Sequence, residues 1–289
     1  MKIMVTGGSG VIGQSLVPKL RQNHEVLTFD IREELWMDIK DFASVSKVME
    51  KGKPEICIHM AAQVGRLTGE NFPQMSVDSN VLGTLNVVKA CLQNGVRLIN
   101  FSTSEVFGHN SVYGKPDILS QNGMYGITKL AAEAVVKHFC DTYSLRAVSV
   151  RPFMVYGPHE TPNGEFRSAI SNFLDTAMKG GTIHAHAGCV RSWCYVEDFV
   201  EGMSILLNYE PTGYEAFCIG TEEYRSMEDA AQVCINTVGK GNYVVEEIPQ
   251  FFVSAVKKAD FSKMKSLGFD PKINLEEGVK RTYKWMRER

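Results

Sequence analysis

A glycine-rich loop near the start of the chain constrains the fold more than any other feature. Residues 2–6 read Lys-Ile-Met-Val-Thr, a short apolar run typical of a strand, and residues 7–13 read Gly-Gly-Ser-Gly-Val-Ile-Gly before a helical pattern. Glycines here allow a tight turn and close approach of the backbone to a pyrophosphate, while the helix N-terminus supplies amide donors. The loop therefore predicts a dinucleotide site. Its residues are Gly7, Gly10, Val11, Ile12 and Gly13.

Strands and helices alternate through the first half of the chain. We expect further strands at 25–30, 55–59, 96–102 and 145–151. Helices are expected at 11–23, in a segment ending near 52–54, at 75–94 and at 125–143. Strands separated by helices form parallel βαβ units with right-handed crossovers. The predicted fold class is therefore α/β, a Rossmann-type doubly wound parallel sheet.

The alternation ends at residues 156–164, which contain two prolines and two glycines. Such a segment indicates a loop or a boundary. Beyond it we expect helices at 166–179, 196–207, 226–238 and 275–287. We therefore predict a dinucleotide-binding domain over residues 1–162. Residues 163–289 would form a smaller C-terminal α/β substrate-binding lobe, interleaved with the main sheet.

Charge and composition narrow the range of partners. The formal net charge is −2, so a nucleic-acid partner is not expected, and no apolar stretch is long enough to span a bilayer. The start lacks the features of a signal peptide, and the seven cysteines contain no Cys-x-x-Cys pair, which predicts reduced thiols in the cytoplasm. His184, His186, Cys189 and Cys194 do not have the spacing of a metal site, and none is expected.

Asp30 bears on which dinucleotide is bound. It ends the second expected strand, about 20 residues beyond Gly10, where an acid binds the ribose hydroxyls and repels the 2′-phosphate of NADP. NAD is therefore the expected cofactor, although Arg32 close by is a residue type that accommodates that phosphate. Asp38 and Ile39 either cover the adenine or form a surface turn.

Tyr125 and Lys129 form a Tyr-x-x-x-Lys pair on one face of an expected helix. An ammonium beside a phenol favours the phenolate, so the tyrosine can act as a base. In isolation such a pair is as readily a surface feature. Here Thr103 follows the expected strand 96–102, and ligands of parallel sheets lie at the carboxyl ends of the strands. Thr103 is therefore placed near the cofactor.

With further segments in the same order, the chain resembles the extended short-chain dehydrogenase/reductase family. This is the group of NAD-dependent nucleotide-sugar epimerases, dehydratases and decarboxylases. The segments are Met-Ala-Ala-Gln at 60–63, Asn-Val-Leu-Gly-Thr at 80–84, Arg-Pro-Phe-Met-Val-Tyr-Gly-Pro at 151–158, Arg-Ser-Trp-Cys-Tyr-Val-Glu-Asp at 191–198, and the pattern over 267–278. Met154 departs from the family, which has a substrate-contacting asparagine at that position.

The resemblance implies roles for individual residues. Thr103 would bond the sugar 4-hydroxyl, Tyr125 would remove its proton, and Lys129 would hold the nicotinamide ribose. Further cofactor contacts would come from Ala61, Ala62 and Asn80. Substrate contacts would come from Ser104, Arg167 and Arg191, the last at the diphosphate. The implied partner is a nucleoside diphosphate sugar, and the implied assembly is a homodimer through the helices around 81–88 and 131–139.

Glu105 bears on the reaction type. The order Thr103-Ser104-Glu105 resembles GDP-mannose dehydratases and UDP-glucuronate decarboxylases, and in the dehydratases this glutamate is the base at C5 of a 4-keto sugar. A carboxylate that only orders the loop is the alternative interpretation. We therefore favour 4,6-dehydratase or decarboxylase chemistry slightly. A simple UDP-sugar 4-epimerase, an NAD(P)H-dependent keto-sugar reductase and a non-catalytic dinucleotide-binding regulator are the alternatives.

Overall fold

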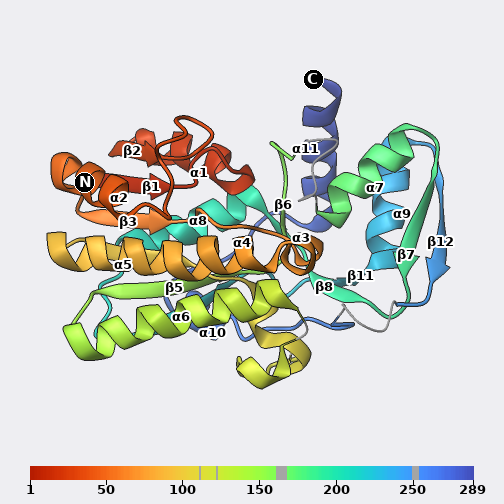
Figure 1. The fold of residues 1–289 in the computed structure, drawn as a ribbon. Helices are drawn as coiled ribbons and strands as arrows, with labels where there is room; N and C mark the ends of the chain where they lie inside the picture. The colour runs from red at the N-terminus through yellow and green to blue at the C-terminus, as the bar shows by residue number, and fades with distance from the viewer. Residues whose placement is uncertain (111, 122, 161–167, 249–253) are drawn as a thin grey trace.

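A six-stranded sheet forms the centre of the molecule (Figure 1). The computed structural model describes residues 1–110, 112–121, 123–160, 168–248 and 254–289. Every neighbouring pair of strands in this sheet is parallel. The order across the sheet is β10 (Glu215–Ile219), β5 (Ala147–Pro152), β4 (Arg97–Phe101), β3 (Ile56–His59), β1 (Lys2–Thr6) and β2 (Glu25–Phe29). The predicted α/β doubly wound class is confirmed.

The strand order reverses at β1. From β1 the chain adds β2 on one side and then crosses to β3 on the other. In such sheets the crevice beyond the carboxyl ends of the two diverging strands is the usual ligand site. Gly7 follows β1 and Met60 follows β3, and the Met60 N–H donates to the Thr6 carbonyl at 3.0 Å. The glycine-rich loop therefore begins at this switch point.

Helices cover both faces of the sheet. Ile3 and Val5 of β1 face α1 (Val11–Arg21) and α8 (Val196–Leu207), whereas Met4 faces the opposite layer. That layer contains α2 (Phe42–Gly52), α5 (Gly83–Asn94) and α6 (Met124–Tyr143). Alternate strand residues thus contribute to two apolar cores, as expected for a sheet that is buried on both faces.

The helix expected over 75–94 is not uniform. The structure has α4 (Pro73–Val77), a π-helical turn η1 (Asp78–Leu82) and then α5, with the Gly83 N–H donating to the Asp78 carbonyl five residues earlier. A preceding short helix α3 (Arg66–Asn71) was not predicted. The chain is helical on both sides of the π turn, so the sequence reads as one continuous helix and does not reveal it.

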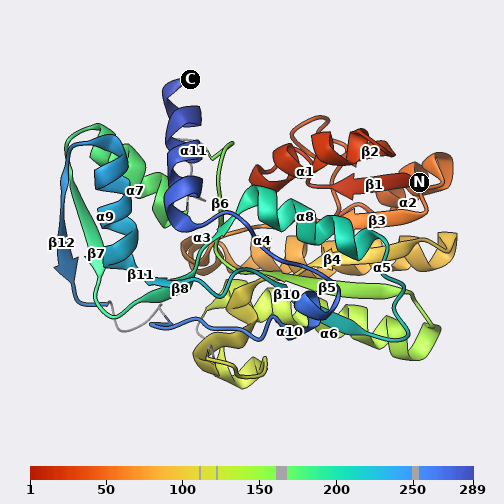
Figure 2. The same ribbon diagram turned by 180° about the vertical axis from the view of Figure 1, so that it is seen from behind.

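Three helices of the C-terminal half gather at the end of the molecule away from the N-terminus (Figures 1 and 2). There α7 (Ala169–Met178) packs against α9 (Met227–Val238), and α9 packs against α11 (Leu275–Arg287). Beside them β7 (Thr182–His186) pairs with β12 (Asn242–Glu246). None of the helices in the described ranges is long and apolar enough to cross a membrane.

Side-chain caps explain why the predicted bounds of α9 and α11 are accurate. Ser226 accepts the Asp229 N–H while Asp229 accepts the Ser226 N–H, which forms a reciprocal capping box at α9. Asn274 accepts the Glu277 N–H at the start of α11. Each cap satisfies a donor that the first helical turn leaves unpaired.

Short elements connect the main sheet to this end of the molecule. In two-stranded pairs β6 (Val155–Tyr156) lies beside β9 (Cys194–Tyr195), and β8 (Val190–Ser192) lies beside β11 (Tyr224–Ser226). The 3-10 helical segments η2 (Ser104–Asn110) and η3 (Ile118–Ser120) follow β4, and α10 (Ser262–Ser266) precedes α11. Since β10 pairs with β5, the C-terminal half also contributes a strand to the central sheet.

Candidate active site

The glycine-rich loop has a backbone that only glycine accommodates at two positions. Gly7 has φ +74°, and a Cβ there would lie 2.6 Å from the Ala61 backbone nitrogen. A Cβ at Gly13 would overlap the Gly8 carbonyl. Gly10 precedes α1 without a side-chain cap. These glycines let the loop pack closely against neighbouring backbone, and the first amides of α1 are left for an anionic ligand such as a pyrophosphate.

Asp30 is buried at the end of β2, where its carboxylate accepts two backbone N–H groups. Its Oδ2 accepts from Ser9 and its Oδ1 from Arg32, each at 2.8 Å. The carboxylate is thereby fixed beside the glycine-rich loop with remaining lone pairs for ribose hydroxyls. The exposed Arg32 turns back, and its Nη1 donates to the Ser9 carbonyl at 3.2 Å.

Asp38 and Ile39 lie on the segment between β2 and α2. The Ile39 side chain is buried against α5, where a Cβ at Gly83 would lie 2.6 Å from Ile39 Cδ1. The carboxylate of Asp38 accepts the Lys40 N–H at 2.9 Å. Ile39 thus contributes its side chain to the core, and the predicted contact of this pair with the adenine stays a prediction.

Thr103, Tyr125 and Lys129 come together at the carboxyl end of β4. The Thr103 side chain lies beside the Tyr125 phenol, and Lys129 lies one turn further along α6. Burial raises the pKa of Tyr125 to about 12, although the Thr103 hydroxyl acts in the opposite direction. Burial lowers the pKa of Lys129 to about 8, with Glu133 opposing the change. The arrangement suits proton transfer at the Tyr125 oxygen.

Asn80 lies in the π turn η1 and is fully buried. Its Oδ1 accepts the Gln63 N–H at 2.8 Å, and its Nδ2 donates to the Gln63 carbonyl and to Thr128 Oγ1, each at 3.0 Å. Thr128 in turn donates to the Tyr125 carbonyl at 3.1 Å. In the structure this side chain joins the segment after β3 to the helix that carries Tyr125. The direct cofactor contact that the resemblance implied for Asn80 stays a prediction.

A buried histidine that the sequence did not single out continues this network. Thr84 Oγ1 donates to the Asn80 carbonyl at 2.7 Å, so it accepts from His59 Nε2 at 3.1 Å. Burial lowers the pKa of His59 to about 3, so the ring is neutral and its Nδ1 accepts from Thr6 Oγ1 at 2.7 Å. Thr6 also accepts the Ala61 N–H at 3.2 Å. The network thus fixes the backbone at Ala61, and Ala62 follows directly.

Glu105 forms an ion pair with Lys257, which the sequence analysis missed. Lys257 is buried, and the two residues are separated by 152 positions in the chain. Burial alone raises the pKa of Glu105, but the charges of Lys257, Arg66 and Arg191 bring it below its ordinary value. The other oxygen, Oε2, is buried and has no hydrogen-bond partner within the described residues. Glu105 is therefore held as a carboxylate, and its Oε2 is available to accept a hydrogen bond from a ligand.

Of the three other residues predicted to contact the substrate, two lie beside the site and one is outside the described residues. Arg191 is buried, and its Nη1 donates to the carbonyls of Ala255 at 2.6 Å and Val190 at 2.9 Å. Ser104 is buried at the start of η2, beside Thr103. Arg167 lies outside the described residues. Arg191 and Ser104 thus lie beside the other site residues, and their substrate contacts stay predictions.

Met154 adopts a left-handed backbone with φ +41°, a conformation that asparagine tolerates better than methionine. Its side chain packs against the larger apolar core. The departure from the family pattern therefore replaces a polar group by an apolar contact at a strained position.

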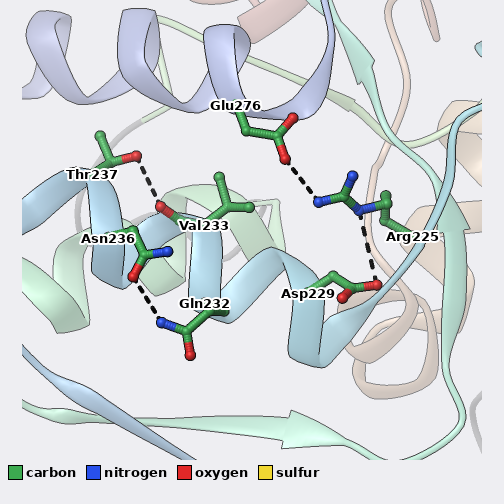
Figure 3. Close-up of a pocket in the computed structure, with 7 residues that line it drawn as sticks. All are labelled: Arg225, Asp229, Gln232, Val233, Asn236, Thr237 and Glu276. Carbon is green, nitrogen blue, oxygen red and sulfur yellow. Dashed lines mark hydrogen bonds and ion pairs between the residues drawn. The ribbon is translucent and has the colours of Figure 1, made fainter.

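Neither the hollow between α9 and α11 nor the histidines and cysteines of the C-terminal half form a second candidate active site. A hollow of about 390 Å³ lies between α9 and α11, but its polar side chains already have partners (Figure 3). Gln232 bonds to Asn236, and Thr237 donates to the Val233 carbonyl. In the same hollow Arg225 forms an ion pair with Glu276. His184 of β7 pairs with Glu246 of β12. Within the described ranges, no three His, Cys, Asp or Glu residues form a group that could hold a metal ion.

Comparisons with known proteins give one consistent result. Residues 3–220 match the model of the NAD dependent epimerase/dehydratase family. The chain is 29% identical to a putative UDP-glucose 4-epimerase of Methanocaldococcus jannaschii, over 99% of this chain and 98% of the relative. It is 30% identical to UDP-glucuronic acid decarboxylase 6 of Arabidopsis thaliana, over 96% and 87%. The UDP-glucose 4-epimerase of Thermus thermophilus, solved in complex with NAD, superposes with a TM-score of 0.88 at 26% identity, covering 99% of both chains.

Proposed function

Because the chain belongs to the NAD-dependent epimerase/dehydratase family, we propose that it oxidises a nucleoside diphosphate sugar transiently at C4 and then transforms the 4-keto sugar. The observation that carries this proposal is the grouping of Thr103 beside the Tyr125 phenol with Lys129 one helical turn away. We further propose that residues 1–162 hold the cofactor and that residues 163–289 supply most contacts to the substrate.

The side chains divide the proton transfer at C4 between them. Thr103 orients the 4-hydroxyl, and Tyr125 accepts its proton. NAD, when bound, supplies the hydride acceptor for C4 and the hydride that is later returned. With its pKa raised to about 12, the Tyr125 phenol needs a positive neighbour to act as a base near neutral pH. The Lys129 ammonium fills that role while it holds the nicotinamide ribose, and Gly7, Gly10 and Asp30 hold the rest of the dinucleotide.

The pair of Glu105 and Lys257 favours decarboxylation over dehydration at the next stage. Dehydration needs a base at C5, a role that the Glu105 carboxylate suits, and also an acid at the leaving hydroxyl, which Glu105 does not supply because Lys257, Arg66 and Arg191 disfavour its acid form. A 4-keto uronate is a β-keto acid, so its C5–C6 bond breaks with loss of CO2 and the electron pair passes into the C4 enolate. The Lys257 ammonium then delivers a proton to C5, and the returned hydride restores the C4 alcohol. This sequence consumes no net oxidant.

The charge around Glu105 suits such a substrate. Three cationic side chains, Arg66, Arg191 and Lys257, act on a single carboxylate. The buried Arg191 and Lys257 together carry one positive charge more than Glu105, which favours an anionic substrate such as a diphosphate with a sugar carboxylate. We therefore propose a UDP-uronate decarboxylase, in keeping with the Arabidopsis relative. The second candidate is a UDP-sugar 4-epimerase, which the archaeal relative favours and for which Glu105 would only order the loop.

Turnover in heavy water separates these candidates. Purified protein is incubated with UDP-glucuronate and, separately, with UDP-glucose, and the products are identified by mass and NMR. A decarboxylase releases CO2 from the uronate and places deuterium at C5. Glu105→Gln slows that step, because Lys257 loses the carboxylate that favours its ammonium form. A 4-epimerase gives the C4 epimer without deuterium and without CO2. Steady consumption of NADH would indicate a net reductase. If no nucleotide sugar were turned over, the non-catalytic dinucleotide-binding regulator would be the remaining alternative.

The homodimer is a separate proposal. Leu67 of α3, Met75 of α4, Leu82 of η1 and Phe72 between α3 and α4 are between 46% and 71% exposed. These apolar side chains lie on or next to the helices expected to form the interface. Leu82→Asp should shift the sedimentation coefficient to that of a monomer. Val245→Asp, at a position of 53% exposure on β12, is the matched control and should leave it unchanged. A wild-type monomer would exclude the proposal.

A further inference from the structure

A second carboxylate, Glu33, lies beside Asp30 at the edge of the glycine-rich loop. Glu33 Oε1 accepts from Ser9 Oγ at 2.9 Å, and its Oε2 accepts from Thr28 Oγ1 at 2.6 Å. The Ser9 N–H donates to Asp30 at 2.8 Å. Ser9 therefore contacts both carboxylates, one through its backbone and the other through its hydroxyl. The two acids thus lie next to each other where the ribose of a dinucleotide is held.

Arg32 brings a positive charge to the same place. Its Nη1 donates to the Ser9 carbonyl at 3.2 Å, and its backbone N–H donates to Asp30 at 2.8 Å. An arginine in this region of a dinucleotide fold is the group that accommodates a 2′-phosphate. If Asp30 were the sole acid, its charge and that of Arg32 would cancel, and a 2′-phosphate would meet a neutral group of side chains. With Glu33 included, the three side chains carry one net negative charge.

We propose that Glu33 is a specificity-determining residue, whose carboxylate offsets Arg32 and thereby excludes the 2′-phosphate of NADP. Asp30 fills a different role, because its two oxygens are fixed by backbone N–H groups and face the ribose hydroxyls as acceptors. Glu33 is held from two sides, by the loop after β1 and by β2. Its charge is therefore kept next to Ser9 and does not move away with a flexible side chain.

Titration of nucleotide-stripped protein with NAD and NADP, by calorimetry, tests the proposal without reference to any substrate. Glu33→Gln keeps the size of the side chain and removes its charge. It should tighten NADP binding about tenfold and change NAD binding less than about threefold, since a lost unit charge acts on a phosphate dianion at close range. Glu34→Gln is the matched control, because Glu34 is also exposed and carries the same charge one residue further along.

The control should leave the ratio of the two dissociation constants unchanged. An equal gain for NADP in Glu33→Gln and Glu34→Gln would overturn the proposal, since a general surface charge would then explain it. An unchanged ratio in Glu33→Gln would overturn it as well. Arg32→Gln in the otherwise native chain gives a second measurement. It should weaken NADP binding about tenfold, and it should abolish the gain when combined with Glu33→Gln. Retention of the gain in that double variant would refute the role given to Arg32.

Discussion

The ion pair between Glu105 and Lys257 gives a quantitative test of the charge arrangement in the site. The Lys257 side chain is 3% exposed and that of Glu105 is 15% exposed, so each charge depends on the other for compensation. Removal of one partner from a buried pair costs about 3–5 kcal/mol, whereas removal of both is often close to neutral. Substitution of each residue alone and of both together therefore measures the coupling.

The two single substitutions should not cost the same. Lys257→Met leaves Glu105 with the charges of Arg66 and Arg191 nearby, so we expect a loss of about 3 kcal/mol in the free energy of unfolding. Glu105→Gln leaves Lys257 beside the same two cations with the carboxylate gone, so we expect about 5 kcal/mol. The double variant should lose at least about 2 kcal/mol less than the sum of the two single losses.

Urea unfolding of the ligand-free protein, followed by circular dichroism, measures these free energies. Because the pKa of Glu105 is lowered on folding, its stabilising contribution is present above the unfolded value of 4.5 and is lost as pH falls through the folded value. In Lys257→Met the folded pKa moves upward towards 4.5, so this contribution should be smaller and its loss should be complete at a higher pH. Additive single and double losses would refute the coupling, and a larger loss in Lys257→Met than in Glu105→Gln would refute the role of the other cations.

Three further predictions concern the catalytic helix and the cofactor loop. Tyr125→Phe should lower turnover about 10²–10⁴-fold while a titration finds NAD binding nearly intact; near-native turnover would remove Tyr125 from the mechanism. Gly7→Ala should lower the melting temperature and weaken NAD binding, because the added Cβ would lie 2.6 Å from the Ala61 nitrogen at φ +74°; native affinity would contradict this close approach. Glu133→Gln should move the alkaline limb of the pH–turnover profile below about pH 8, because Glu133 raises the pKa of Lys129; an unmoved limb would count against it.

Features encoded by neighbouring residues could be predicted from the sequence. The glycine loop, the Tyr-x-x-x-Lys pair and the bounds of α8 and α11 depend on contacts within a few residues, so motif and periodicity were enough. The strands of the main sheet were predicted to within two residues for the same reason. The exception is β10, a short apolar strand that was not expected, because its pairing with β5 is formed between distant parts of the chain.

The rest of the site depends on contacts between distant segments. Lys257 belongs to no motif, and its neighbour Val256 reaches β8 through a single bridge to Val190, so nothing local connects it with Glu105. His59 and Thr84 become a network only when β3 and η1 are packed together. Polar residues of this kind carry no periodic signal, and their partners are set by the tertiary fold.

The pairing of β10 with β5 has a consequence for how the chain folds and how it can be divided. The strand that completes the sheet is made only after residue 214, so a fragment ending near residue 162 would present β5 as an open edge. Val148 and Val150 of that strand are buried in the intact protein. Such a fragment should self-associate rather than fold as a separate dinucleotide-binding module, and the intact chain should unfold in one cooperative transition. Chimeras that exchange substrate lobes between relatives would therefore have to carry β10 with the sheet that it completes.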